Sequence, residues 1–344
     1  MKNPSMECAI FFDTFGRNIA FAVTQEEFLA RGFLPGDGVN VVFSGGTSFF
    51  DILYCTGMLV KDGSVYLSSL GPDEPLKLVR SNANGMWGEA GVFEQETVQI
   101  TRATPQKYRA VQKLNELVYT DNRADYPSDE AFVNFRAVSG GRMQNNFLYR
   151  GASPWDERLG RHKIVDALIK KAGIQTVLSI PDSEEGIAGR LASNNFDAPY
   201  YSALYKSGRV IPLAKEGREY RSADFAKRTA DGLRCMISAE GPFYIHCLEG
   251  KTRTGFICML LEILAGFSYE ELVTDYMQSY VNYYRITMES DPEDYSLIKE
   301  LKFDEMLSFI AGGGHDFISG VRKYLRSGGM TDKEIDALVL RITG

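Results

Sequence analysis

Short apolar runs separated by turn residues dominate the first hundred positions of the chain. Runs rich in β-branched and aromatic residues lie at positions 8–12, 18–23, 38–43, 63–67, 75–79 and 96–100. Short runs at this regular spacing are typical of the strands of a small barrel or sandwich. A capping box, Thr24-Gln-Glu-Glu27, predicts one short helix among them. The pattern therefore predicts an all-β, barrel-like domain over residues 1–104.

The pattern changes near residue 105. Residues 105–117 are helix-forming and begin with a proline, which the first position of a helix tolerates well. Residues 121–129 are polar and predict a connector. We therefore expect a helix and connector at 105–130 and a second domain at 131–344.

The second domain alternates short apolar runs with segments of helical period. Residues 176–180 and 241–245 are typical of buried strands, whereas 223–238, capped by Ser222, and 256–265 have helical length. Further helices are predicted at 267–279, 294–310, 317–326 and 331–342. This order predicts an α/β fold in which helices flank a mainly parallel sheet, with the loop after residue 246 at its carboxyl edge.

That loop has the composition of a phosphate site. Residues 246–255 read His-Cys-Leu-Glu-Gly-Lys-Thr-Arg-Thr-Gly and join a strand to a helix. A tight loop entering a helix directs backbone N–H groups and the positive end of the helix dipole at an anion. The guanidinium of Arg253 binds phosphate oxygens in a bidentate manner, and the same field favours the thiolate of Cys247. We therefore predict that Cys247 attacks phosphorus and forms a cysteinyl-phosphate.

The other loop residues have predicted roles beside this nucleophile. Arg253 and the loop amides stabilise the equatorial oxygens of the transition state, and the Thr254 hydroxyl assists departure of the sulfur. The residues predicted to surround the bound phosphate are His246, Leu248, Glu249, Gly250, Lys251 and Thr252. Of these, His246 is expected mainly to order the loop.

The motif His246-Cys247-x5-Arg253-Thr254-Gly255 resembles the signature of the cysteine-dependent protein tyrosine phosphatases. Lys251 makes the loop similar to those of the bacterial branch of this family and of phosphoinositide phosphatases. Segments 134–141, 147–153 and 268–276 resemble further parts of the bacterial branch, so the resemblance spans roughly residues 120–344. It implies the tyrosine phosphatase fold and hydrolysis of phosphotyrosine, extending to phosphoserine and phosphothreonine if the enzyme has dual specificity.

The N-terminal part carries a fainter resemblance. Segments 12–18 and 36–39 resemble the β-barrel half of S-adenosylmethionine hydrolase-type proteins, whose catalytic half has no counterpart here. We therefore carry over no ligand and expect a structural barrel that packs against the phosphatase domain or shapes access of the substrate.

The proton donor is the least defined part of the predicted mechanism. Many relatives have aspartate immediately before the loop arginine, where this chain has Thr252. The leaving oxygen needs an acid within hydrogen-bond reach. Glu216 is the first candidate, Glu219 the second and Asp182 the third, against the plain alternative that each is a solvated surface carboxylate.

Two charged loop residues leave the substrate class open. Glu249 is expected to point outward and pair with Lys251 or Arg253, and Lys251 either contacts a second phosphate or balances Glu249. If Lys251 contacts a second phosphate, the enzyme is predicted to be a phosphoinositide or inositol phosphate phosphatase. Lys215, Arg218 and Arg221 are then candidates for further basic groups around the pocket. A third alternative is a phosphate-binding pseudophosphatase, because Thr252 stands where relatives have an acid.

Composition narrows the remaining classes. The 344 residues carry a formal net charge of −7 and show no basic stripe, which argues against a nucleic-acid partner. The partner implied by the phosphatase resemblance is a phosphorylated protein or a small phosphate ester. The five cysteines form no CxxC pair and the three histidines are widely spaced, so neither a disulfide framework nor a metal site is predicted. No cofactor is predicted either. Cys235 and Cys258 are expected in the core. Apolar runs are too short for a membrane span, and the first residues lack the apolar core of a signal peptide. We expect a cytoplasmic protein, or a secreted one if a leader has been removed, with no oligomeric state specified by the sequence.

Overall fold

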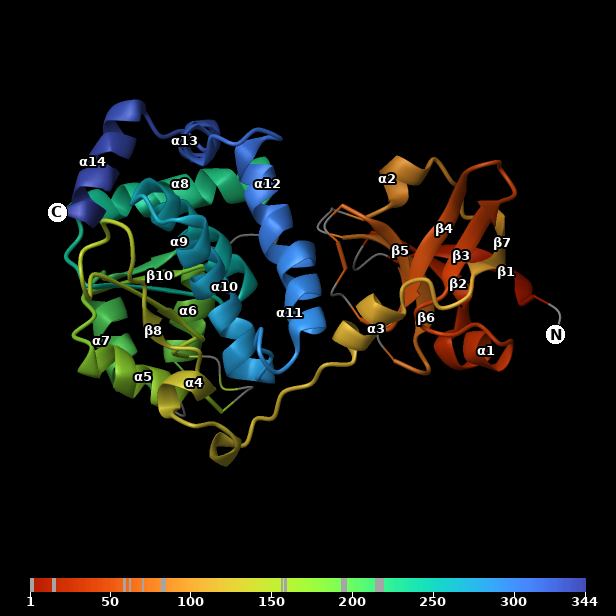
Figure 1. Ribbon diagram of the computed structural model, residues 1–344, viewed down its shortest axis with the longest axis horizontal. Helices are drawn as coiled ribbons and strands as arrows, with labels where there is room; N and C mark the ends of the chain where they lie inside the picture. Colours follow the sequence, from red (N-terminus) through yellow and green to blue (C-terminus); the bar gives the residue numbers. More distant parts are fainter. Residues whose placement is uncertain are drawn as a thin grey trace. The chain divides into compact units, whose positions relative to one another are not determined.

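The structure is a computed structural model that describes residues 3–13, 17–57, 60–61, 63–69, 71–81, 85–155, 157, 160–192, 197–213 and 220–344. The chain divides into two compact units, one formed by residues 1–118 with 291–305 and the other by residues 119–290 with 306–344. Figure 1 shows their elements along the chain.

The strands described in the first unit close into a barrel, as the spacing of the apolar runs predicts. They are β1 (Ser5–Asp13), β2 (Asn18–Thr24), β3 (Gly38–Phe43), β4 (Ser48–Cys55), β5 (Val65–Ser68), β6 (Pro75–Arg80) and β7 (Thr97–Thr104). Their order around the barrel is β1-β2-β6-β5-β4-β3-β7, and only the β4–β5 pair of these neighbours is parallel. Alternate side chains such as Phe21, Phe43 and Leu78 fill the interior.

Strand β4 is the barrel strand that the sequence pattern missed. Asp51 in its middle has a positive φ of 51°, and the register with β3 shifts between Val39 and Val41. Such a bulge breaks the two-residue alternation of side chains on which a strand prediction depends. The run therefore lacks the periodicity that marks the other strands.

Short helices accompany the barrel. They are α1 (Gln25–Ala30), α2 (Trp87–Ala90), α3 (Arg109–Asn115), α11 (Pro292–Ile298) and the π-helix η3 (Lys299–Asp304). The capping box predicted at Thr24 is present, with the Thr24 side chain accepting from the Glu27 N–H. The helix predicted from residue 105 begins later, because Gln106 has a φ of 52° and its N–H donates to Asp37 Oδ1 over 2.8 Å. Residues far along the chain belong to this unit, since Lys113 pairs with Asp294 at 2.9 Å.

The strands described in the second unit form a five-stranded sheet in the order β11-β10-β12-β9-β8. They are β8 (Arg136–Ala137), β9 (Leu148–Gly151), β10 (Thr176–Ser179), β11 (Val210–Pro212) and β12 (Phe243–His246). Neighbours from β11 to β9 run parallel, and β8 pairs antiparallel with β9. The predicted mainly parallel sheet is confirmed, and β12, which leads into the candidate loop, lies at its centre.

Helices cover this sheet. They are α4 (Asp129–Phe132), α5 (His162–Lys171), α6 (Glu184–Leu191), α7 (Pro199–Lys206), α8 (Ala223–Ser238), α9 (Thr252–Leu264), α10 (Tyr269–Tyr284), α12 (Glu305–Ala311), α13 (Phe317–Ser327) and α14 (Asp332–Thr343). Figure 1 shows α5, α6 and α7 on one side of the sheet and α8, α9 and α10 on the other. Helix α9 is buried from Thr254 to Leu264, and most of these residues are apolar, as in a central helix, with Glu262 as the buried carboxyl among them.

Two cysteines predicted to lie in the core differ in their burial. Cys258 is buried in α9 as predicted, whereas Cys235 is exposed and its core assignment was wrong. Helix α8 buries the stripe that contains Phe225, Leu233 and Met236, and Cys235 lies beside that stripe. Among the helices described, none is long and apolar enough to cross a membrane.

One helix start depends on a side chain from another element. The N-cap residue of α7, Ala198, offers no side-chain acceptor, but the Asp166 carboxylate of α5 accepts from the N–H groups of Tyr200 and Tyr201 over 3.1 and 2.7 Å. Asp166 thus satisfies donors that a helix start leaves open.

Replacing this carboxylate should destabilise the second unit. We expect Asp166→Ala to lower the free energy of unfolding by about 1–3 kcal/mol, because two N–H groups lose a charged acceptor. Denaturant unfolding followed by circular dichroism measures the loss, with Glu185→Ala on the exposed side of α6 as control. Equal stability of the two variants would show that α7 does not depend on Asp166.

Candidate functional site

The candidate loop occupies residues 247–251, between the end of β12 and the start of α9. The neighbouring strands hold the beginning of the loop: the Ser153 N–H after β9 donates to the Leu248 carbonyl over 2.9 Å, and the Ile180 N–H after β10 donates to the carbonyl of His246, the last residue of β12, over 3.0 Å. The loop therefore lies at the carboxyl edge of the sheet, where the sequence places it.

Gly250 permits a close approach that no other residue allows. Its φ is +68°, and a Cβ added to it would lie 2.3 Å from the carbonyl carbon and oxygen of Gly151 in β9. A side chain would therefore force the loop away from the neighbouring strand, which explains the glycine in the motif.

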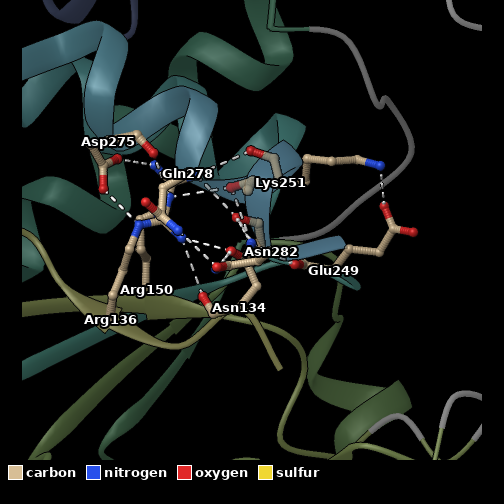
Figure 2. A network of polar contacts seen from close by, with 10 residues as sticks. Asn134, Arg136, Arg150, Glu249, Lys251, Asp275, Gln278 and Asn282 are labelled. Atoms are coloured by element: carbon tan, nitrogen blue, oxygen red, sulfur yellow. Dashed lines mark hydrogen bonds and ion pairs between the residues drawn. The ribbon is translucent and has the colours of Figure 1, made fainter. Parts of the chain in front are cut away.

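The loop carbonyls all have partners outside the loop. Asn134 Nδ2 donates to the carbonyls of Glu249 and Gly250 over 3.1 and 3.2 Å, and Arg150 Nη2 donates to those of Gly250 and Lys251 over 3.0 and 3.2 Å (Figure 2). In a planar trans peptide the N–H points opposite to the carbonyl. With the Leu248 carbonyl held by Ser153, four successive peptide units from 248 onward therefore turn their N–H groups toward the hollow of the loop.

The start of α9 adds to this set of donors. Its N-cap residue, Lys251, makes no side-chain capping bond within the part of the chain described, so the first N–H groups of the helix stay available to an anion. Arg253 lies in the first turn and is half-buried. The loop amides, the helix start and one guanidinium thus surround one position suited to a phosphate.

Cys247 lies at the start of the loop with its side chain 5% exposed. Burial alone raises the pKa of the Cys247 thiol, but the charge of Arg253 and the hydroxyl and N–H of Thr254 outweigh burial and lower that pKa below its usual value. Thr254 Oγ is buried and bonds no nitrogen or oxygen of the described residues, which leaves its hydroxyl for the sulfur. The site therefore favours a thiolate.

His246 lies beneath the loop, fully buried. Its ring contacts those of Tyr244 and Tyr201 at centroid distances of 5.7 and 6.3 Å, and Nδ1 lies 3.2 Å from the Cys247 carbonyl oxygen. These contacts order the base of the loop.

The residues that hold the loop are themselves fixed by a buried charge cluster (Figure 2). Asp275 pairs with Arg150 Nη1 and, at 2.8 Å, with Arg136 Nε. Burial raises the pKa of Asp275, but the two guanidinium groups lower it well below its usual range. Burial and the charge of Asp275 raise the pKa of the neighbouring Glu262 well above its usual value.

Sequence reasoning missed the roles of Asn134, Arg136, Arg150 and Asp275. It quoted them only as parts of segments that resemble a family. The signal that marks Asn134 is its positive φ of 56°, which asparagine tolerates better than most residues, and this is a property of the structure.

Glu249 and Lys251 pair with each other at the side of the loop. Glu249 Oε2 lies 3.2 Å from Lys251 Nζ, and the Tyr119 hydroxyl donates to Glu249 Oε1. Lys251 Nζ also donates to the Tyr284 hydroxyl over 2.9 Å. Of the aromatic run in α10, residues Tyr276, Tyr280 and Tyr283 are buried, which agrees with core packing.

Of the three candidate proton donors, the structure describes one, Asp182. Glu216 and Glu219 lie outside the described residues, as do the basic candidates Lys215 and Arg218. Asp182 is 8% exposed and accepts from Trp155 Nε1 and Ser179 Oγ. Since Trp155 follows β9 and Asp182 follows β10, their hydrogen bond spans the end of β12 between those strands.

Arg221, the remaining basic candidate, is exposed. Its guanidinium lies over the rings of Tyr220 and Phe309, at 5.6 and 5.0 Å from their centroids.

Within the described ranges, histidine, cysteine and carboxylate side chains form no group suited to a metal ion.

Removing the Thr254 hydroxyl should raise the pKa of Cys247, because that hydroxyl stabilises the thiolate. We expect the pH dependence of Cys247 alkylation by iodoacetamide to move to higher pH in Thr254→Ala and to return in Thr254→Ser. An unchanged profile in Thr254→Ala would assign the low pKa to Arg253 and the amides alone.

Removing the Asn134 side chain should weaken the anion site without disturbing the backbone. Asn134→Gly keeps the positive φ but removes one donor from each of the carbonyls of Glu249 and Gly250, which keep Tyr283 and Arg150 as their respective donors. We expect inorganic phosphate to protect Cys247 from alkylation about tenfold less well, the loss of one or two net hydrogen bonds. The matched control is Asn146→Gly, at an exposed asparagine with φ of 54°. Equal protection in both variants would contradict a role for Asn134 in shaping the loop.

Comparisons with known proteins identify relatives of the chain. Residues 130–344 match the model of the tyrosine phosphatase family. The triple specificity protein phosphatase PtpB of Mycobacterium tuberculosis is 28% identical over 131 residues, which are 36% of this chain and 45% of that protein. The chain thus matches less than half the length of that relative.

Two solved structures are also similar to the chain. The core catalytic domain of the PP-IP phosphatase SIW14 from S. cerevisiae is 17% identical, with a TM-score of 0.29 over 52% of this chain and 91% of that chain. TpbA of P. aeruginosa is 19% identical, with a TM-score of 0.26 over 62% of this chain and 92% of that chain. Because the family model covers well over half of the residues and includes the whole candidate loop, the chain belongs to the tyrosine phosphatase family.

Proposed function

We propose that the chain hydrolyses phosphotyrosine, and phosphoserine or phosphothreonine if its specificity is dual, through a cysteinyl-phosphate on Cys247. The observation that carries this proposal is a buried thiol of lowered pKa at the start of a loop whose N–H groups face one phosphate-sized position. The Cys247 thiolate attacks phosphorus, and the bond from phosphorus to the tyrosine oxygen breaks. Water then attacks the cysteinyl-phosphate and releases inorganic phosphate and the thiolate.

The surrounding groups divide the remaining work. Arg253 and the N–H groups of residues 249–252 hold the equatorial oxygens in both steps. Thr254 stabilises the sulfur as it departs. Asn134 and Arg150 act as positioning residues, because they touch the loop carbonyls and not the phosphate.

In the first step an acid gives its proton to the leaving oxygen, and in the second step its conjugate base takes a proton from the attacking water. We propose Glu216 as the acid that protonates the leaving oxygen, with Glu219 and Asp182 as the second and third candidates. Removing a general acid lowers a rate by about 10²–10⁴-fold.

Other functions are less well supported. An inositol phosphate or phosphoinositide phosphatase needs cations for further phosphates, and Lys251 is paired with Glu249. A pseudophosphatase has no need of a thiol of lowered pKa beside an arginine. The similarity to a phosphatase named for triple specificity nevertheless justifies phosphoserine peptides and phosphoinositides as test substrates.

The biological setting belongs to the same proposal. A reactive unpaired thiol is easiest to keep reduced in the cytoplasm, and we place the protein there, in the bacterial branch of the family. The domain limits at 1–104, 105–130 and 131–344 also stay predictions. We further propose that the partner is a phosphorylated protein or a small phosphate ester and that the reaction needs no cofactor.

Kinetics of substituted proteins test the function. We expect the wild type to hydrolyse a small aryl phosphate, and Cys247→Ser to lose at least about 10³-fold in kcat because the nucleophile is gone. Cys235→Ser, at an exposed cysteine, is the matched control and should retain full activity. In the wild type, the rate should fall as the pH rises and the acid loses its proton. Glu216→Gln should not show this fall between about pH 4 and pH 8. A wild type inert on aryl phosphate, phosphopeptides and phosphoinositides that still binds phosphate would establish a binding module instead.

A further inference from the structure

Resting on the phosphatase function proposed above, we propose that Glu249, held by Tyr119, neutralises Lys251 and so selects against substrates with a second phosphate beside the scissile one. Glu249 and Lys251 are then specificity-determining residues of the loop, and Tyr119 is a positioning residue. The favoured substrates are monoesters whose surroundings carry no further phosphate.

The ion pair is charged on both sides and largely shielded. Its side chains are 25% exposed for Glu249 and 12% exposed for Lys251. Burial raises the pKa of Glu249, but the charge of Lys251 and the Tyr119 hydroxyl lower it below the usual value. Burial lowers the pKa of Lys251, and the Glu249 charge reverses this and raises it. The two side chains together therefore contribute no net charge to the rim of the phosphate site.

The lysine is also enclosed by aromatic rings. Lys251 Nζ lies 4.9, 5.6, 5.7 and 5.9 Å from the ring centroids of Tyr284, Tyr280, Tyr283 and Tyr119. Cation–π contacts and the hydrogen bond to the Tyr284 hydroxyl hold the ammonium in this position. Lys251 therefore cannot extend toward a second phosphate without leaving these partners.

The carboxylate is held on both oxygens. Tyr119 donates to Oε1 while Lys251 pairs with Oε2. The Tyr119 ring packs against Tyr283 with centroids 4.8 Å apart and lies under the Arg161 guanidinium. Tyr119 thereby keeps the negative charge of Glu249 on Lys251.

The test compares a substrate with one phosphate to the same substrate with two. We would measure kcat/KM for a phosphotyrosine peptide and for the same peptide with two adjacent phosphotyrosines, in the full chain. The ratio of the second value to the first removes any change in Cys247 reactivity, which affects both peptides alike.

Glu249→Gln should raise this ratio about tenfold, the effect of one uncovered charge at the partly buried rim of the phosphate site. The rise should shrink between about 50 and 500 mM salt, because salt screens such charges. Glu249→Gln with Lys251→Gln should restore the wild-type ratio. Tyr119→Phe, which keeps both charges but frees one carboxylate oxygen, should give a smaller rise.

Lys251→Gln alone gives the opposite sign and keeps the proposal testable if Glu249→Gln does not fold. It leaves Glu249 unbalanced, so the ratio should fall below that of the wild type. A ratio unchanged in both single variants, with the singly phosphorylated peptide still hydrolysed, would overturn this inference and leave the phosphatase function intact. A wild type inert on both peptides and on aryl phosphate would instead overturn the phosphatase function itself.

Discussion

The direction of four peptide units in the loop at 247–251 is the constraint on which the site depends. Their carbonyls are held from outside by Ser153, Asn134 and Arg150, so their N–H groups face inward before any anion arrives. Dipoles fixed in advance cost no reorganisation when charge develops on a bound phosphate. The central position of β12, the glycine contact with β9 and the buried arginine all serve this one arrangement.

The residues that hold those carbonyls are themselves held by charge in the core. Arg150 and Arg136 share Asp275, and burial together with the charge of Asp275 raises the pKa of the nearby Glu262 well above its usual value. The Arg150 guanidinium thus has a carboxylate partner on one side and the loop carbonyls of Gly250 and Lys251 on the other. Closer to the sulfur, the charge of Arg253 and the hydroxyl and N–H of Thr254 lower the pKa of the Cys247 thiol below its usual value.

The sequence allowed prediction of what depends on local pattern. The barrel, the mainly parallel sheet and the loop follow from periodicity and from one motif of fixed spacing, and the tyrosine phosphatase resemblance is confirmed. Strand β4 was missed because a bulge at Asp51 interrupts its alternation, and Cys235 was misplaced because it lies beside the buried stripe of α8. The residues that hold the loop carbonyls could not be predicted from motif spacing. Asn134 and Arg150 lie a hundred residues or more before the carbonyls to which they donate, and only the folded sheet brings them together.

Charge within the loop also explains what the loop can and cannot supply. Thr252 stands where many relatives have an aspartate, and Glu249, which adds a carboxylate, is turned onto Lys251 and Tyr119. The loop therefore offers an anion its N–H donors, and its one carboxylate, Glu249, is paired with Lys251. In the proposed mechanism the proton for the leaving oxygen therefore comes from another segment, either that of Glu216 and Glu219 or that of Asp182. Under that mechanism, binding of the phosphate and delivery of the proton depend on different parts of the chain, so a substitution that removes the acid need not weaken phosphate binding.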